Sequence, residues 1–331
     1  MARSSGSMQP LSVGNVISAS IRLYGNHLKQ YLLIAVIAAG WSILPTIIDW
    51  GIQAIFFGST LAQLSNPAAA SNPAGNPGIL LLFRLAILAL AIYCSAKYYL
   101  NLGLLSRLAF GELMEKPEPT ATARDRLKPI MFRFLVTQIL VGLLAFAVIF
   151  GVFLGWFILS NIISRAVGSQ NILLGVLVNL VLLIAAIGLT IWVCSRWFLA
   201  EVPLAIEEES TSGAAIGRSW KLTQGYATRI LMIVLVAGII TLPLYAVASI
   251  PFLSAVFAAA PLAAQQANNI NSAAAAGAMV QIITGLALSF LLVLIFNTFV
   301  VPFWQSIKSV IYFDLRNRQE GLGLQLRDRT P

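Results

Sequence analysis

The chain has 331 residues, of which 59% are hydrophobic and only 10% are charged, and its mean hydropathy is +0.86. Soluble domains are about 45–50% apolar and about 25% charged, so the composition excludes an ordinary soluble protein and predicts an all-α membrane protein. The net charge of +9 is interpreted as an orientation signal, and no nucleic-acid partner is expected.

Six apolar runs are each long enough to cross a hydrocarbon core of about 30 Å as a helix. None shows the polar–apolar alternation of a membrane β-barrel strand. Of the 21 lysines and arginines, all but Arg84 and Arg165 fall on one side if the N-terminus is inside. The positive-inside rule therefore predicts three helical hairpins with both termini cytoplasmic. In chain order the runs are Tyr31–Phe57, Ile79–Asn101, Pro129–Ile163, Asn171–Ala200, Arg229–Phe257 and Met279–Phe303.

A segment with helical periodicity precedes each predicted hairpin. Ser12 is placed to cap the first, and Gly213–Thr228 repeats its pattern, whereas Thr120–Lys128 is a shorter copy that Pro129 interrupts. One apolar face of this kind is typical of helices that lie on a membrane surface, which is where we expect these segments. The apolar face of the first is formed by Val13, Val16, Ile17, Ile21, Tyr24 and Leu28.

The chain contains an approximate internal repeat. Gly14 and Ser20 align with Gly213 and Ser219 at a spacing of 199, and the stretch that begins at Lys97 aligns with the one at Arg196 at a spacing of 99. We interpret residues 1–331 as a single polytopic domain of three copies, which could pack around a pseudo-threefold axis. The copies are approximately 11–103, 118–203 and 210–307, and a charged cytosolic tail at 308–331 follows them.

Two sets of charged residues are candidate functional sites. Asp49 and Arg84 are the ionisable residues placed most deeply toward the outer side. They could form a gating or ion-coupling pair or a structural salt bridge, or they could be two separate charges that reach the outer interface. The second set is a basic and aromatic patch that could hold anionic lipid headgroups, with ordinary topogenic charge as the alternative. It consists of Arg22, Lys29, Arg218, Trp220, Lys221 and Arg229.

The end of the last span carries a further charged motif. On a helix, Asp314 pairs with Arg318 and Arg316 with Glu320, each four residues apart. We expect these pairs to be exposed and to fix the helix end at the interface, each contributing about 0.3–0.5 kcal/mol. Tyr312 precedes them, and Gly321 stands where a helix C-cap is expected.

No known catalytic or cofactor-binding motif is found. The single histidine, His27, has no evident acid–base partner, and the two cysteines, Cys94 and Cys194, lie in apolar runs typical of buried thiols. The sequence contains no phosphate-binding loop, nucleophile elbow or zinc motif. We therefore expect no cofactor, no metal and no catalytic residue.

Three stretches carry a resemblance to a known family: Leu11–Ile37, Gly217–Leu222 and Ile311–Gly321. They resemble bacterial integral membrane proteins related to the membrane domain of glycerophosphoryl diester phosphodiesterases. The resemblance implies a six-span module in the plasma membrane and makes the charged motif after Tyr312 a family feature. The phosphodiesterases hydrolyse substrate in a separate barrel with a metal, which has no counterpart here, so hydrolytic activity is not expected.

Two functions are favoured on this basis over a third, a membrane-embedded enzyme, because the sequence has one histidine and no clustered acid–base set. The uncharged outer loops and the basic patch favour a non-enzymatic protein that organises membrane lipid or a protein partner, including a second copy of the chain, at the cytosolic face. The repeated hairpins, the prolines in the spans and the pair Asp49 and Arg84 favour a transporter or channel for a small or lipidic solute.

Overall fold

The computed structural model describes residues 12–65, 77–167, 171–207, 210–268 and 272–320, and within these ranges the chain is helical with no strand. Six of the helices are long and apolar enough to cross a membrane, so the protein is an integral membrane protein with several spans, as predicted. Their bounds are α2 Leu28–Ser65, α3 Pro77–Leu113, α5 Met131–Val167, α6 Ile172–Cys194, α9 Ala227–Asn268 and α10 Ser272–Glu320.

Short helices connect the long ones. Two of them begin with a side-chain cap: Ser12 Oγ accepts from the Asn15 amide in the first, and Thr211 Oγ1 accepts from the Ala214 amide in α8. The cap at Ser12 was predicted from the sequence. The short elements are α1 Val13–Asn26, α4 Thr120–Leu127, η3 Lys128–Ile130, η5 Ser195–Trp197, α7 Glu201–Ile206 and α8 Ser212–Leu222.

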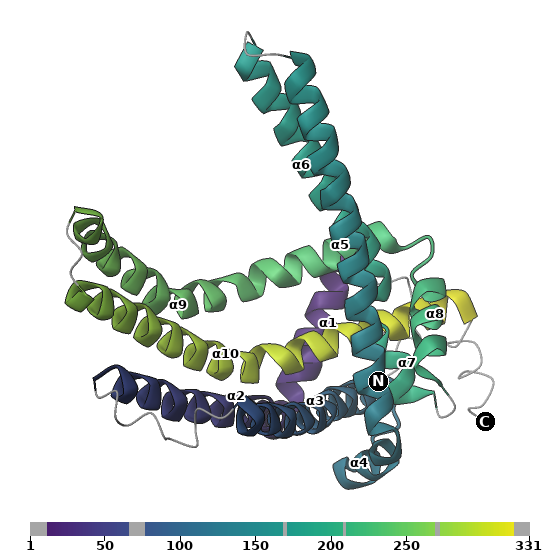
Figure 1. Ribbon diagram of the computed structural model, residues 1–331. Helices are drawn as coiled ribbons and strands as arrows, with labels where there is room; N and C mark the ends of the chain where they lie inside the picture. The colour runs from purple at the N-terminus through teal and green to yellow at the C-terminus, as the bar shows by residue number, and fades with distance from the viewer. Residues whose placement is uncertain (1–11, 66–76, 168–170, 208–209, 269–271, 321–331) are drawn as a thin grey trace, which may run out of the picture.

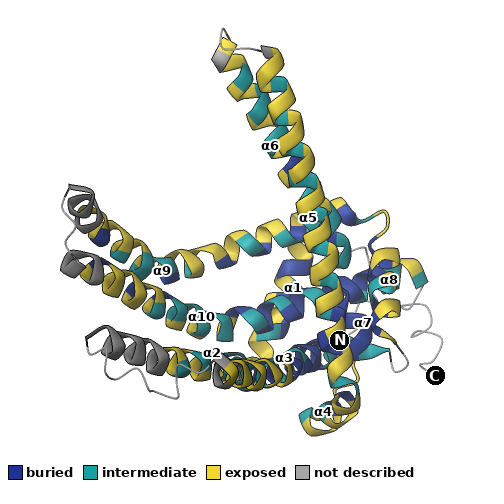
Figure 2. Cartoon of the chain, in the orientation of Figure 1, coloured by how far each residue is buried: buried dark blue, intermediate teal, exposed yellow. Residues whose placement is uncertain are grey.

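Consecutive long helices pack against each other, α2 on α3, α5 on α6 and α9 on α10. The α2–α3 and α9–α10 pairs leave a common base on the same side, whereas the α5–α6 pair leaves it in another direction (Figure 1). The apolar outer parts of the helices are largely uncovered by protein, and buried residues concentrate at the base (Figure 2). The base therefore holds the molecule together.

The three short helices α1, α4 and α8 each pack against a long helix of a different pair from the one that they precede. α4 contacts α3, α8 contacts α5 and η5, and α1 contacts α9 and α10. The long helices also contact each other from pair to pair: α5 contacts α3, α9 contacts α6 and α2 contacts α10. These contacts link the three pairs into a closed ring at the base.

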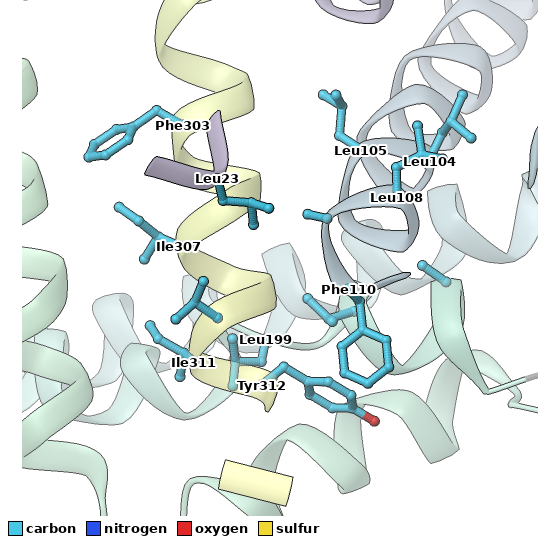
Figure 3. Close-up of a cluster of buried hydrophobic side chains, with 14 of the residues drawn as sticks. Leu23, Leu104, Leu105, Leu108, Phe110, Leu199, Phe303, Ile307, Ile311 and Tyr312 are labelled. Carbon is cyan, nitrogen blue, oxygen red and sulfur yellow. The ribbon is translucent and has the colours of Figure 1, made fainter. Parts of the chain in front are cut away.

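The hydrophobic core at the base is formed by the inner ends of the long helices and by the short helices. Leu23 of α1 belongs to the buried cluster that also includes Leu105 of α3 and Ile307 of α10 (Figure 3). Val16 and Ile17 of α1 are also buried, because α1 packs on α9 and α10. The prediction that the apolar face of α1 lies on the membrane is therefore wrong for these residues; protein covers it instead.

The last helix continues past its apolar span, as the helical spacing of its charges predicted. α10 runs without a break to Glu320, so residues 308–320 of the predicted charged tail belong to this helix. Ile311, Tyr312 and Leu315 of this segment are buried in the core. Its apolar side chains alternate with the charged ones at helical spacing, so one face packs inward while the other carries ion pairs. Residues 321–331, including Gly321, lie outside the described ranges.

Candidate functional site: a network of ion pairs at the base of the helices

Arg218 connects three elements of the base through two carboxylates. Its Nε lies 3.1 Å from Glu207 Oε1, and its Nη2 donates to Glu320 Oε1 at the end of α10. Glu320 Oε2 accepts in turn from Arg316 Nε at 2.8 Å, and the Tyr312 hydroxyl donates to Glu207 Oε1 at 2.7 Å. The network therefore ties α8 to the segment after α7 and to α10.

The electrostatics of Arg218 favour its charged form. Partial burial lowers the pKa of the guanidinium, but the carboxylates of Glu207 and Glu320 and the Tyr312 hydroxyl outweigh this effect. The pKa of Arg218 therefore lies above its ordinary value. Arg218 keeps its charge at every physiological pH, so the network cannot open by deprotonation of this residue.

Asp314 lies between two arginines in the core. Its Oδ2 is 2.6 Å from Arg229 Nη1 and 2.9 Å from Arg318 Nε, and only 5% of the residue is exposed. The Arg318 guanidinium also lies 5.5 Å from the ring centre of Tyr226. Buried charges of this kind must be paired, and here the pairing joins α9 to α10.

The charged motif of the last helix thus has the spacing expected from the sequence, but its environment is different. Asp314 pairs with Arg318 and Arg316 with Glu320, four residues apart as predicted. The expectation of exposed pairs is wrong, because Asp314 is buried and each pair has a further cationic partner from another helix. The sequence shows only the partners within the last helix. The partners from α8 and α9 depend on how these helices pack against α10.

The structure divides the basic and aromatic patch into two groups. Arg218 and Arg229 are turned into the network of ion pairs, so they are not presented to a lipid headgroup. The remaining four are exposed: Arg22, Lys29, Trp220 and Lys221. Only this second group has the accessibility that a lipid contact requires.

Asp49 and Arg84 lie together, far from the base network in the chain. Arg84 Nη1 is 2.5 Å from Asp49 Oδ1, and Gln53 Nε2 donates to Asp49 Oδ2 at 2.5 Å. The side chains of Asp49 and Arg84 are 26% and 53% exposed in the protein alone. α2 and α3 therefore bring these two residues into contact, with a third polar partner that the sequence analysis did not identify.

A buried ion pair that the sequence analysis did not single out lies between α7 and α10. Lys308 Nζ is 2.6 Å from Glu201 Oε1, and Gln138 Nε2 of α5 donates to Glu201 Oε2 at 2.6 Å. One signal in the sequence could have shown it. At a spacing of 99, Glu201 stands where the neighbouring copies have Leu102 and Val300, so a charge replaces an apolar residue.

The histidine and the two cysteines lie in surroundings that are typical of structural residues. His27 Nε2 lies 3.6 Å from Glu112 Oε2, a partner that was not evident from the sequence. Cys94 is buried and Cys194 partly so, and the two thiols are free. Within the described ranges no three His, Cys, Asp or Glu side chains are grouped so that they could hold a metal ion.

Comparison with family models, with curated proteins and with solved structures gives no match to this chain.

Proposed function

We propose that this integral membrane protein is non-enzymatic and organises anionic lipid at the cytosolic end of its helices. The observation that carries the proposal is the contrast between base and spans. Among the six spans found in the described residues, at most 22% of the most apolar 18-residue window is buried, and in the span that includes α5 none of it is. Apolar faces that do not pack on each other are available to acyl chains, so the spans are suited to holding lipid around a rigid base.

The positions of the exposed cations support a cytosolic base. Lys29 at the start of α2 and Lys221 at the end of α8 are exposed, as is Arg22 on α1. Each cation near an anionic membrane surface contributes about 1 kcal/mol to binding. With the base in the cytoplasm, both termini are cytoplasmic and the positive-inside rule is obeyed, in keeping with a plasma-membrane protein.

Recurring burial supports an architecture of three copies. At the spacing of 199, Val16 and Ala215 are buried, as are Ser20 and Ser219. Tyr31, Phe134 and Ile230 extend the pattern to all three copies, since each is about 1% exposed near the start of an odd-numbered span. The closed ring of contacts at the base is what three copies around a pseudo-threefold axis would produce.

A non-enzymatic role is supported by what the acidic groups contact. Glu201, Glu207, Asp314 and Glu320 each contact a lysine or arginine at the base. Carboxylates held in this way join helices at the base and have their charge compensated there. They have the geometry of structural pairs, and the likeness to the membrane part of the phosphodiesterases, without their catalytic barrel, remains a prediction in agreement with this role.

The experiment that tests the proposal is lipid binding to the purified full chain, measured by native mass spectrometry with phosphatidylglycerol and phosphatidylcholine. We expect tighter binding of phosphatidylglycerol, and about thirtyfold weaker binding in Lys29→Gln/Lys221→Gln, at about 1 kcal/mol per cation. The matched control, Lys29→Arg/Lys221→Arg, keeps the charges and should bind as the wild type does. Equal affinity for the two lipids would contradict the proposal.

A transporter is the second candidate, and the contact of Asp49 with Arg84 and Gln53 favours it. Ionisable groups within spans often mark solute or ion pathways. Solute flux into proteoliposomes that falls in Asp49→Asn would support transport. Absence of flux across a broad panel of small and lipidic solutes would rule it out in favour of the lipid-organising role.

A further inference from the structure

An arginine lies between two tryptophan rings at the junction of α6 and α8. Arg196 belongs to η5, the turn that follows α6. Its guanidinium carbon is 5.0 Å from the ring centre of Trp192 and 5.3 Å from that of Trp220. Trp197 lies beside Trp220, with ring centres 5.8 Å apart. Rings from two helices thus hold one cation.

Hydrogen bonds to the backbone of Arg196 fix this arrangement. The Arg196 carbonyl accepts from Ser219 Oγ at 2.7 Å and from Thr223 Oγ1 at 3.5 Å. Ser219 and Thr223 are fully buried. α8, which carries Trp220, is therefore held at a defined position next to the guanidinium, so the site is formed in advance of any ligand.

The guanidinium of Arg196 has no anionic partner within the described part of the chain. No carboxylate of these residues lies within 4.0 Å of it, and its buried Nε makes no hydrogen bond. Arg218, two residues before Trp220 on α8, differs because it contacts two carboxylates. Arg196 as a residue is partly exposed although its Nε is buried. A guanidinium that is partly desolvated by aromatic faces and has no carboxylate partner is suited to binding phosphate.

The surroundings of Arg196 match the headgroup layer of a membrane. Trp192 and Trp220 are 37% and 40% exposed, and Lys221, which follows Trp220 in the chain, is exposed. Tryptophan concentrates at the membrane–water interface, where lipid phosphates lie. We propose that Arg196, with Trp192, Trp220 and Lys221, binds the phosphate of an anionic glycerophospholipid. This inference rests on the proposed function and adds to it the lipid group and the residue that recognises it.

The same pair of cation and ring recurs 99 residues earlier. Lys97 Nζ lies 5.4 Å from the ring centre of Tyr93, and these residues correspond to Arg196 and Trp192. In the third copy the corresponding residues are Leu291 and Ile295, which carry no charge. The Arg196 site is the stronger of the two, because lysine lacks the planar fork of arginine.

The test is titration of the full chain with phosphatidylglycerol, followed by native mass spectrometry. We expect Arg196→Gln to bind this lipid about five- to tenfold more weakly, as for the loss of one cation near the membrane surface. Arg165→Gln is the matched control, since it removes an exposed arginine near the end of α5 that is distant from η5, and should bind as the wild type does. Wild-type affinity in Arg196→Gln would overturn the site.

Quenching of tryptophan fluorescence by phosphatidylglycerol with brominated acyl chains provides a second measurement if Arg196→Gln fails to fold. We expect quenching in the wild type that decreases in Trp220→Phe, which leaves every charge in place. Unchanged quenching in this variant would also overturn the site. Displacement of the lipid by millimolar inorganic phosphate would overturn its assignment to a lipid, since a headgroup held in the membrane resists a free ion.

The two proposals can fail separately. Preference for phosphatidylglycerol that is lost in Lys29→Gln/Lys221→Gln but kept in Arg196→Gln would leave the proposed function in place and remove the Arg196 site. No preference for this lipid in the wild type would contradict both.

Discussion

Glu201 and Lys308 form an ion pair whose side chains are only 3% and 17% exposed. Lys308 Nζ also lies 5.1 Å from the ring centre of Phe198, so its charge has two favourable contacts. Removing one member of a buried ion pair leaves the other charge uncompensated, whereas replacing both with apolar residues can be nearly neutral. The main effect of this pair on stability is therefore the cost of the unpaired buried charge that is left when one member is removed.

We predict that Lys308→Met lowers the free energy of unfolding by about 3–5 kcal/mol, because the Glu201 carboxylate stays buried without its cation. Glu201→Leu/Lys308→Met should recover most of this loss, since the matching copies place Leu102 and Val300, both buried, at the position of Glu201. Thermal unfolding in detergent, followed by circular dichroism, measures the difference.

Lys128→Met is the control for this comparison. Lys128 pairs with Asp125 at the surface, where the two side chains are 57% and 66% exposed. Such pairs contribute about 0–1 kcal/mol, so the melting temperature should change little. Equal melting temperatures for Lys308→Met and the wild type would show that the buried pair is dispensable.

The contact between α9 and α10 depends on a glycine. A Cβ atom on Gly285 of α10 would lie 2.7 Å from the carbonyl oxygen of Pro251 and would also collide with the Cβ of Ala255. Ser289 Oγ accepts from the Phe252 amide at 2.9 Å, which adds a hydrogen bond across the same contact. Small residues permit such close approach of membrane helices, so Gly285 sets the distance within this pair.

We predict that Gly285→Ala destabilises the protein by about 1–3 kcal/mol, the usual cost of overpacking, because α9 must move away from α10. Gly151→Ala in α5 is the control, since a Cβ there has no neighbour within 4 Å and alanine favours a helix by about 1 kcal/mol. Thermal unfolding of both variants distinguishes the two effects. A stable Gly285→Ala would mean that the pair tolerates wider separation.

The number and positions of the long helices could be predicted from the sequence. Each span exceeds the length needed to cross the hydrocarbon core, and hydropathy alone identifies it. The N-cap at Ser12 was also predictable, because it depends on residues three positions apart. Whether the apolar face of α1 packs on lipid or on protein was not predictable. Acyl chains and a protein core are both apolar, so either surface is compatible with the same side chains.

The candidate site was predictable only where its contacts are local. The pairs within the last helix follow from a spacing of four, but the contact of Lys308 with Glu201 joins residues 107 positions apart. Nothing in the periodicity of either segment specifies such a partner. Asp49 makes one contact of each kind. The hydrogen bond from Gln53 is local, since Gln53 lies four residues after Asp49 on α2, whereas for Arg84 only the proximity of two charges at similar depth in one hairpin was foreseeable.

At the scale of the whole molecule, the three pairs of long helices share a base but not a direction (Figure 1). Membrane helices are tilted on average by about 20°, so pairs that cross one bilayer must run nearly side by side. The α5–α6 pair has few contacts outside the base that would resist such a movement, because only 0% and 6% of its two span windows are buried. A bilayer should therefore bring this pair toward the others.

We predict that spin labels at Leu159 of α5 and Ile250 of α9 lie closer together in lipid nanodiscs than in detergent micelles, which impose no common direction. Both positions are exposed, so labels are tolerated. Labels at Leu159 and Leu177, within one pair, provide the control and should show no change. Pulsed electron paramagnetic resonance measures both distances, and identical distributions in the two environments would contradict the prediction.

The closed ring of contacts at the base has a consequence for how the chain is made. α1 leaves the ribosome before the other described helices, yet its buried face packs on α9 and α10, which are made after them. At about 5–20 residues per second, roughly 15–60 s separate the synthesis of α1 from that of the end of α10. During this interval Val16, Ile17 and Leu23 have no protein partner from the last pair and must be shielded by lipid or by the insertion machinery. α1 therefore reaches its final packing only after α10 has been made. A nascent chain that ends before α9 would lack the contacts that close the ring at the base.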